Sequence, residues 1–247
     1  MSLFFAFNEI KSVTASDEDS FYPASNLLEH PTYKEYRAVG TEASLVFDLE
    51  NTVPVDSFLM CGSNATGEIQ VTELTLEANT TDDWTTPAHT QTYELTLENQ
   101  LYNIVHLDFT AQTFRYWRLT VSNPTGSYVG LSNVFLGSKI ELPIDLGYTF
   151  SVADKSEIAK GRYGQRFIDR LPDLRSFSAS MSVMNQTEKD SMESITHFCS
   201  THTPFWMVLN EGESLLEAGY FYFDKAPQFE NQAYQIYNTS FELTEVV

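Results

Sequence analysis

Apolar side chains recur at every second position in many short runs of this 247-residue chain. In Ser44–Leu49 they occupy positions 45, 47 and 49, which is the period of a half-buried β-strand. Ile104–Phe109 shows the same alternation, and Val55–Cys61 is mostly apolar, as an inner strand would be. Turn-forming residues separate these runs, and this order predicts a β-sandwich or a β-barrel.

The character of the sequence changes near residues 138–146, SKIELPIDL, and we place a domain boundary there. Residues 1–140 are predicted to form a β-sandwich. Residues 141–247 are predicted to form a small β-barrel or sheet with one α-helix, so the whole chain is mainly β. Thr187 is expected to cap the helix, with Asp190 at its third position.

The net charge of −20 limits the partners of the chain. An acidic surface repels phosphate groups, so binding to free nucleic acid is not expected. No window approaches the roughly eighteen apolar residues of a membrane-spanning helix, and MSLFFAFNEI lacks the basic start of a signal peptide. Cys61 and Cys199 indicate two buried free thiols in a reducing compartment, not a disulfide framework or a zinc site.

The sequence carries no catalytic signature that we would defend. None of the five histidines sits in a metal-ligand motif, and neither GxSxG nor a phosphate-binding glycine loop occurs. We therefore expect no enzyme, no cofactor and no metal site. Asp82 and Asp83 could ligate calcium with loop carbonyls, although adjacent acids are common in solvated loops.

Several segments of the N-terminal part occur in a recognisable order: Tyr22–Leu28, Tyr33–Ala38, Leu45–Leu49 with Val55–Phe58, and Phe114–Gly137. The last reads FRYWRLTVSNPTGSYVGLSNVFLG, an aromatic-basic strand, a turn and a short apolar strand. In this order the segments resemble galactose-binding-like, or discoidin-type, domains. The resemblance implies a jelly-roll β-sandwich that binds or scaffolds and seldom catalyses.

The C-terminal part contains Phe150–Val152, a basic connection, Phe177–Met181, the single helix and Thr203–Trp206. These segments resemble bacteriophage tail-tube or distal-tail barrel domains, in which a helix packs on a sheet that closes with its neighbours into a ring. Together the two parts resemble siphophage distal-tail and baseplate proteins. The resemblance implies tail-tube and hub or baseplate proteins as partners, and a place in the virion tail after synthesis in the host cytoplasm.

A carbohydrate site is the sharpest small-ligand hypothesis. Sugar binding needs an aromatic face for C–H groups and planar polar groups for hydroxyls. The loop residues expected to supply both are Tyr33, Tyr36, Arg37, Asp82, Asp83 and Trp84. Alternatively, these residues fill the loop end of the sandwich or face a neighbouring subunit.

Basic residues concentrate in the connection of the second part. Six of the 14 in the chain fall within 21 residues: Lys155, Lys160, Arg162, Arg166, Arg170 and Arg175. One interpretation is a solvated loop whose charges pair with nearby acids. The other is an assembly loop that docks on the acidic face of a neighbouring subunit in a homo-oligomeric ring.

Two functions are therefore predicted. The first is a structural component of a phage tail tip or baseplate, forming a ring between the tail tube and the receptor-binding apparatus. The alternative is a non-catalytic carbohydrate-binding module that aids adsorption to a host-surface glycan. The two are compatible, since the first domain could decorate a ring built by the second.

Overall fold

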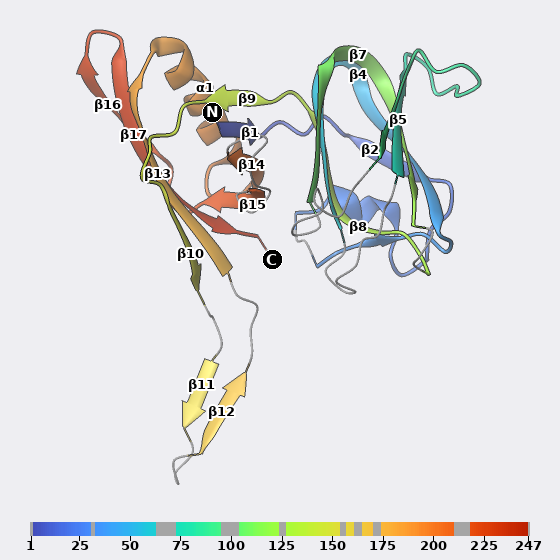
Figure 1. The fold of residues 1–247 in the computed structure, drawn as a ribbon, viewed down its shortest axis with the longest axis horizontal. Helices are drawn as coiled ribbons and strands as arrows, with labels where there is room; N and C mark the ends of the chain where they lie inside the picture. Colours follow the sequence, from blue (N-terminus) through green and yellow to red (C-terminus); the bar gives the residue numbers. More distant parts are fainter. Residues whose placement is uncertain are drawn as a thin grey trace. The chain divides into compact units, whose positions relative to one another are not determined.

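The computed structural model describes residues 2–30, 33–62, 73–94, 104–123, 127–153, 157–160, 165–169, 174–209 and 218–246. Within these residues the chain is mainly β with one α-helix, which confirms the predicted fold class. It divides into two compact units (Figure 1). One, the sandwich unit, contains Phe7–Ile140 with Val208–Ala218. The other, the helix-bearing unit, contains Met1–Ala6, Glu141–Met207 and Gly219–Val247.

The strands of the sandwich unit pair in the order β3-β8-β4-β7-β5-β6, and β2 pairs with β4. A short 3-10 helix, η1 (Ala24–Leu28), follows β2. The strands are β2 (Ser12–Ala15), β3 (Tyr36–Arg37), β4 (Glu42–Gly62), β5 (Glu73–Asn79), β6 (His89–Glu94), β7 (Ile104–Ser122) and β8 (Gly130–Gly137).

β4 is one long strand where the sequence pattern predicted two, and β7 runs beside it as a second long, curved ribbon (Figure 1). Their pairing register shifts between Asp48 and Val53 of β4, and Glu50 between them adopts a φ of 60°. Such an irregularity lets a strand bend and pass from one layer of a sandwich to the other. The buried core includes Trp117, Phe47 and Phe58.

The helix-bearing unit is built on a sheet with the order β10-β13-β17-β15-β14-β1-β9, to which β16 adds by pairing with β17. β11 (Glu157–Lys160) and β12 (Arg166–Asp169) form a separate two-stranded sheet. The remaining elements are β1 (Ser2–Phe5), β9 (Ile140–Leu142), β10 (Thr149–Ala153), β13 (Leu174–Met184), α1 (Gln186–Cys199), β14 (Phe205–Leu209), β15 (Ala218–Phe223), β16 (Gln228–Ala233) and β17 (Ile236–Glu245).

β1, at the start of the chain, belongs to the helix-bearing unit. The predicted boundary at residue 140 had placed this segment in the first domain. All four residues of β1 are buried. Phe4 packs against Phe205 and Phe241, with ring centroids 6.0 and 6.3 Å away. A wholly apolar run such as Leu3–Phe5 suits a strand between two others, because such a strand is covered on both faces.

α1 begins earlier than predicted, and its cap is not Thr187. The side chain of Asn185 accepts from the Glu188 N–H at 3.0 Å, and Glu188 Oε2 accepts from the Asn185 N–H at 2.8 Å. This reciprocal capping box satisfies two free N–H groups, so Asn185 is the N-cap. Met192 and Cys199 lie on the buried apolar stripe of α1, and both cysteines are buried thiols that no disulfide joins. No helix in the described ranges is long and apolar enough to cross a membrane.

Candidate functional site

One end of the sandwich gathers the loops around Arg37, and we call it the Arg37 end. Arg37 pairs with Gly130 at the start of β8. The carbonyl of Thr41 accepts from the N–H of Asn123 at 2.7 Å. These contacts place Arg37 at the end of the sandwich where β7 finishes, at Ser122.

The loop that carries Trp84 lies at the other end, which we call the Trp84 end. This loop follows Asn79, the last residue of β5, and Asn79 pairs with Tyr116 of β7. Tyr116 and Ser122 are six positions apart on one strand, a separation of about 20 Å. The six residues predicted to form one sugar site therefore lie in two separate groups.

Two aromatic rings hold the guanidinium of Arg37. Its central carbon lies 4.0 Å from the ring centroid of Tyr22 and 4.9 Å from that of Tyr128. Arg37 also forms an ion pair with Glu35, whose side chain is only 5% exposed. The Arg37 N–H donates to the carbonyl of Tyr22 at 3.0 Å, which fixes the loop to β3. Stacking and ion pairing together give the guanidinium one orientation.

Three buried polar atoms at the Arg37 end have no hydrogen-bond partner in the described residues. Nε of Arg37, Oε2 of Glu35 and Oδ1 of Asp17 are buried and make no hydrogen bond to any residue the structure describes. A buried polar atom without a partner costs about 1–3 kcal/mol. The three atoms are one donor and two acceptors, so groups that both donate and accept, such as hydroxyls, match them in kind.

Apolar side chains at the same end are open to solvent. Phe21 is 83% exposed, Tyr33 is 73% exposed and Val39 is 69% exposed. Phe21 is positioned by its N–H, which donates to Oδ1 of Asp19 at 2.9 Å. Phe21 directly precedes Tyr22, which stacks on Arg37, and Tyr33 lies four residues before Arg37 in the chain. An exposed ring offers an apolar face, and a guanidinium offers planar donors.

Tyr36 does not belong to this exposed surface, and the expectation that it contacts a sugar is corrected. Its side chain is fully buried, and its hydroxyl donates to the carbonyl of Asp17 at 2.8 Å. Burial, and then the nearby charges of Asp17 and Glu18, raise the pKa of the Tyr36 hydroxyl above its usual value. Tyr36 therefore supports the loop from within the core.

At the Trp84 end the polar groups of the β5–β6 loop satisfy one another, although Nε2 of His89 and Nε1 of Trp117 on the adjoining strands are buried without a partner in the described residues. Trp84 Nε1 donates to Oδ1 of Asp82 at 2.7 Å. The guanidinium carbon of Arg118 lies 4.7 Å from the Trp84 ring centroid, and Arg118 is ion-paired with Glu77 at 2.6 Å. This arrangement ties the β5–β6 loop to the outer face of the sheet.

The acidic pair in that loop is also engaged within the chain. Oδ1 of Asp83 accepts from the N–H of Thr85 at 3.0 Å and from its hydroxyl at 2.8 Å. These two hydrogen bonds lower the pKa of Asp83. In the described ranges, no group of three or more histidine, cysteine, aspartate or glutamate side chains could hold a metal ion.

The six basic residues of the connection fall into different environments. Arg166 is exposed at the start of β12. Arg175 is half-buried on β13 and ion-paired with Glu245, with its Nε 2.8 Å from Oε2. Lys160 lies on β11, and its side chain is not described, while Lys155, Arg162 and Arg170 lie outside the described residues.

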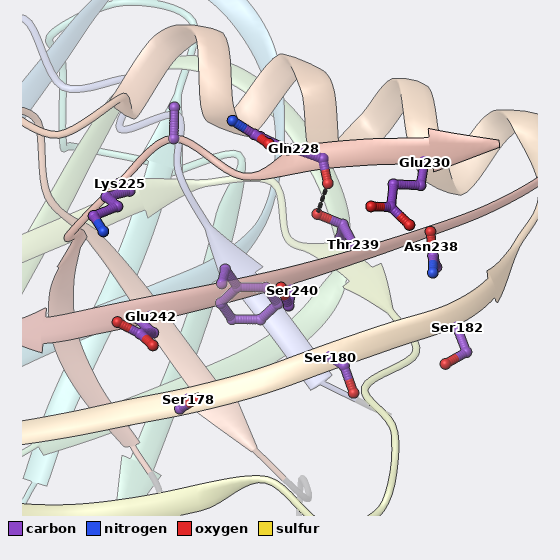
Figure 2. Close-up of a pocket in the computed structure, with 12 residues that line it drawn as sticks. Ser178, Ser180, Ser182, Lys225, Gln228, Glu230, Asn238, Thr239, Ser240 and Glu242 are labelled. Atoms are coloured by element: carbon purple, nitrogen blue, oxygen red, sulfur yellow. Dashed lines mark hydrogen bonds between the residues drawn. The ribbon is translucent and has the colours of Figure 1, made fainter.

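The helix-bearing unit has a polar groove of about 650 Å³ on the exposed face of β13, β16 and β17 (Figure 2). Serine hydroxyls from β13 and β17 line it, together with amide and charged groups from β16, β17 and the turn before β16. Phe241, the aromatic residue among its described lining, is only 3% exposed. The groove therefore offers polar groups but no open ring for stacking.

Comparisons with known proteins return carbohydrate-binding modules. No family model matches the chain, and no curated protein matches it. One similar solved structure is the CBM32 of AlyQ in complex with 4,5-unsaturated mannuronic acid, at 22% identity and a TM-score of 0.43, covering 51% of this chain and 94% of the module. Chitosan-binding module 1 from a Paenibacillus sp. IK-5 chitosanase/glucanase matches at 19% identity and TM-score 0.44, covering 53% and 99%.

A third similar structure is a Streptococcus pneumoniae fucose binding module, SpX-3, at 11% identity and a TM-score of 0.45. The match covers 53% of this chain and 98% of that module. The ligands in these descriptions are those of the three modules.

Sequence reasoning missed part of the Arg37 end. Tyr22, Tyr128, Glu35 and Asp17 were not assigned to a site. Tyr128 is far from Arg37 in the sequence, while Glu35 lies between two residues that were assigned, Tyr33 and Tyr36. Tyr22 stands in a segment that the sequence did single out, Tyr22–Leu28. A concentration of acids just before it, DEDS from Asp17, is the signal that could have found Asp17.

Proposed function

We propose that this chain is a non-catalytic carbohydrate-binding protein that holds a host-surface glycan at the Arg37 end of its sandwich unit. The observation that carries the proposal is the Arg37 guanidinium, held by Tyr22 and Tyr128, with its Nε unused within the described residues. A fixed guanidinium suits sugar hydroxyls, and the exposed ring of Tyr33 suits a sugar C–H face.

A glycan array followed by titration calorimetry tests this function. Tyr33→Ala should weaken binding of the captured glycan by about 3- to 10-fold, because stacking on one ring contributes about 0.5–1.5 kcal/mol. The ring is 73% exposed, so the variant is expected to fold. Trp84→Ala, at the opposite end, is the matched control and should bind as the wild type does.

Two results would overturn the proposal. One is that no glycan binds to the intact chain. The other is that Trp84→Ala loses binding while Tyr33→Ala keeps it, which would move the site to the Trp84 end.

A second candidate function is a ring-forming structural component of a phage tail tip or baseplate. The observation that favours it is the β11–β12 hairpin, whose strands pair only with each other within the described residues. Arg166 of this hairpin is exposed, in a chain whose net charge is −20. A basic arm would offset the repulsion between acidic subunits and orient them in a ring.

Light scattering distinguishes this candidate. The intact chain should form discrete oligomers, alone or with tail-tube protein, and Arg166→Glu should reduce their mass. A wild-type chain that stays monomeric with tube protein present, or an Arg166→Glu variant that assembles equally well, would count against the arm.

A further inference from the structure

We propose that the β11–β12 hairpin of one copy of this chain docks on a second copy, at the end of the sheet where β13 and β16 finish and β17 begins. The contact surface consists of the polar groove and of four exposed residues next to it, which we call the apolar end: Leu146, Val183, Tyr234 and Ile236. The inference rests on the self-assembly of the second candidate function and names the surface that the basic arm contacts. It is independent of carbohydrate binding.

The side chains of the apolar end face solvent. Leu146 is 99% exposed, Tyr234 is 87% exposed and Val183 is 72% exposed. Ile236, at the start of β17, is 37% exposed. Single exposed apolar residues are ordinary on a protein surface, whereas a group of them at one place indicates a contact with another molecule.

Hydrogen bonds to β13 bring Leu146 beside Val183. The N–H of Asp145 donates to the carbonyl of Ser180 at 2.9 Å. The hydroxyl of Ser182 donates to Oδ2 of Asp145 at 2.5 Å. Leu146 follows Asp145 and Val183 follows Ser182 in the chain, so the two apolar residues lie next to this contact.

Strand pairing adds the other two residues. Tyr237 is the partner of the residue that follows Val183, so Ile236 occupies a neighbouring position on the adjacent strand. Tyr234 lies in the turn that joins β16 to β17, directly before Ile236. The four residues therefore form one edge across β13, β17 and the β16–β17 turn.

The backbone is strained at two positions of this edge. Val183 has a φ of 59° and Gln235 a φ of 56°. Few L residues adopt this left-handed region, and a β-branched residue such as valine is an outlier there. Conformations of this kind persist where the surroundings enforce them, and they are frequent at functional contacts. Here an exposed valine is held in one.

The β11–β12 hairpin needs a surface to pack on. Its strands pair only with each other in the described part of the chain. A two-stranded hairpin alone is at best marginally stable in water. Lys160 pairs with Arg166 next to the turn, and like charges at directly paired positions disfavour an isolated hairpin further.

The composition of the hairpin is basic and apolar. Residues 160–166, KGRYGQR, contain three bases and no acid. Phe167 and Ile168 follow directly in β12, and Ile158 lies on β11. A partner surface that combines carboxylates with apolar side chains is the complement of such a segment.

The groove beside the apolar end supplies the carboxylates. Glu230 and Glu242 line it on the exposed face of the sheet (Figure 2), and Asp145 accepts from two of its serines. None of the three forms an ion pair with a residue that the structure describes. Lys225 is the basic residue of the described lining, so acids prevail at this surface.

The hairpin of the same chain is too short to make this contact. It joins β10 to β13 where Ala153 pairs with Leu174, nine positions before Val183, which corresponds to about 30 Å along the strand. Lys160 is seven residues after Ala153, and seven extended residues span at most about 25 Å. The basic end of the hairpin therefore has to come from a second copy.

Sedimentation velocity of the intact chain over a range of concentrations tests the surface. Val183→Asn should weaken self-association by about 10-fold, because it removes an apolar side chain from the contact. Asparagine tolerates the left-handed region better than valine, so the Tm of this variant should equal or exceed that of the wild type. Phe21→Ser, which removes an apolar side chain of similar exposure from the sandwich unit, is the control and should associate as the wild type does.

A mixing experiment identifies the hairpin as the occupant. Arg166→Glu impairs the hairpin and leaves the surface intact, whereas Val183→Asn impairs the surface and leaves the hairpin intact. Each alone should be mostly monomeric at a concentration where the wild type is half associated. Their mixture should form dimers and no larger species, because only one pairing of an intact hairpin with an intact surface is then available.

A charge exchange tests the electrostatic part of the contact. Glu230→Lys added to Arg166→Glu restores opposite charges across the proposed contact and should recover at least half of the lost association. Glu42→Lys, which changes an exposed acid of the sandwich unit by the same amount, should give no recovery when it is added to Arg166→Glu.

The outcomes separate this inference from the second candidate function. Self-association that Val183→Asn leaves unchanged, or a mixture that stays monomeric, overturns the docking surface and leaves assembly standing. Equal recovery by Glu230→Lys and Glu42→Lys shows a net-charge effect and also overturns it. A wild-type chain that is monomeric at every concentration overturns the inference, and the second candidate function then depends on the light scattering with tube protein.

Discussion

Each end of the sandwich unit carries an arginine stacked on an aromatic ring, but the surroundings of the two arginines differ. At one end Arg37 stacks on Tyr22, with 4.0 Å from the guanidinium carbon to the ring centroid. At the other end Arg118 stacks on Trp84 at 4.7 Å. Each arginine is also ion-paired with a glutamate of its own end.

The ends differ in what remains unused. The indole N–H of Trp84 donates to Asp82, so the polar groups of its loop bond to one another, whereas Nε2 of His89 and Nε1 of Trp117 on the adjoining strands are buried without a partner in the described chain. At the Arg37 end, Nε of Arg37 and Oε2 of Glu35 are buried without a partner in the described chain, and the Tyr33 ring is exposed. An arginine on an aromatic ring therefore does not mark a binding site by itself. The arginine–glutamate pairs themselves distinguish the two ends: Arg37 and Glu35 each keep a buried atom without a partner in the described residues, and Arg118 and Glu77 do not.

The largest expected effect comes from removing each arginine. Arg37→Ala leaves the Glu35 carboxylate, 5% exposed, without its counter-charge and should lower the free energy of unfolding by about 3 kcal/mol. Arg118→Ala leaves Glu77, which at 12% exposed is closer to solvent, and should lower it by about 1 kcal/mol. Urea unfolding of the two variants measures the difference.

Glu35→Gln added to Arg37→Ala checks the cause. Because it removes the uncompensated charge, the double variant should regain more than half of the lost stability. Equal losses in the two single variants, or no recovery in the double variant, would mean that the buried carboxylate is not what separates the ends.

A smaller effect tests the internal support of the Arg37 end. Tyr36→Phe removes the hydrogen bond from the hydroxyl to the Asp17 carbonyl and should lower the free energy of unfolding by about 1 kcal/mol. Tyr116→Phe at the Trp84 end keeps its ring under the Arg115 guanidinium, 4.7 Å away, and should have a smaller effect. Thermal unfolding of both variants measures the pair, and a Tyr36→Phe protein as stable as the wild type would show that the bond contributes nothing.

Much of this fold could be predicted from local pattern. The alternation in Ser44–Leu49 predicts a strand whose Leu45, Phe47 and Leu49 face the core, and all three are buried. The continuity of β4 could not be predicted in the same way. A turn and a bent strand have similar sequence patterns. The structure shows a bent strand, because β7 pairs with β4 on both sides of the bend.

The candidate site was predictable only in part, for a topological reason. Tyr33 and Arg37 are close in sequence to each other, and both lie at the Arg37 end. Asp82 and Trp84 also combine a charged group with an aromatic ring, but the direction of β5 carries them to the opposite end. Which loops meet depends on strand order and direction, and a single sequence without that order cannot distinguish the two ends.

The smallest effect concerns acid stability at the Trp84 end. Arg115 binds Asp48 through two hydrogen bonds, 2.7 Å from Nε to Oδ1 and 2.8 Å from a terminal nitrogen to Oδ2. These bonds, and one from the Glu50 N–H, hold the pKa of Asp48 below its ordinary value of 3.8. A carboxyl whose pKa is lowered by folding stabilises the native state above the ordinary value, and that stability is lost as the pH falls through the lowered one. Asp48→Asn should therefore flatten the dependence of Tm on pH below about pH 4. Asp17→Asn, at the Arg37 end, is the comparison variant. Profiles for the wild type and Asp48→Asn that run parallel throughout would show that the Arg115–Asp48 pair contributes no acid-sensitive stability to the Trp84 end.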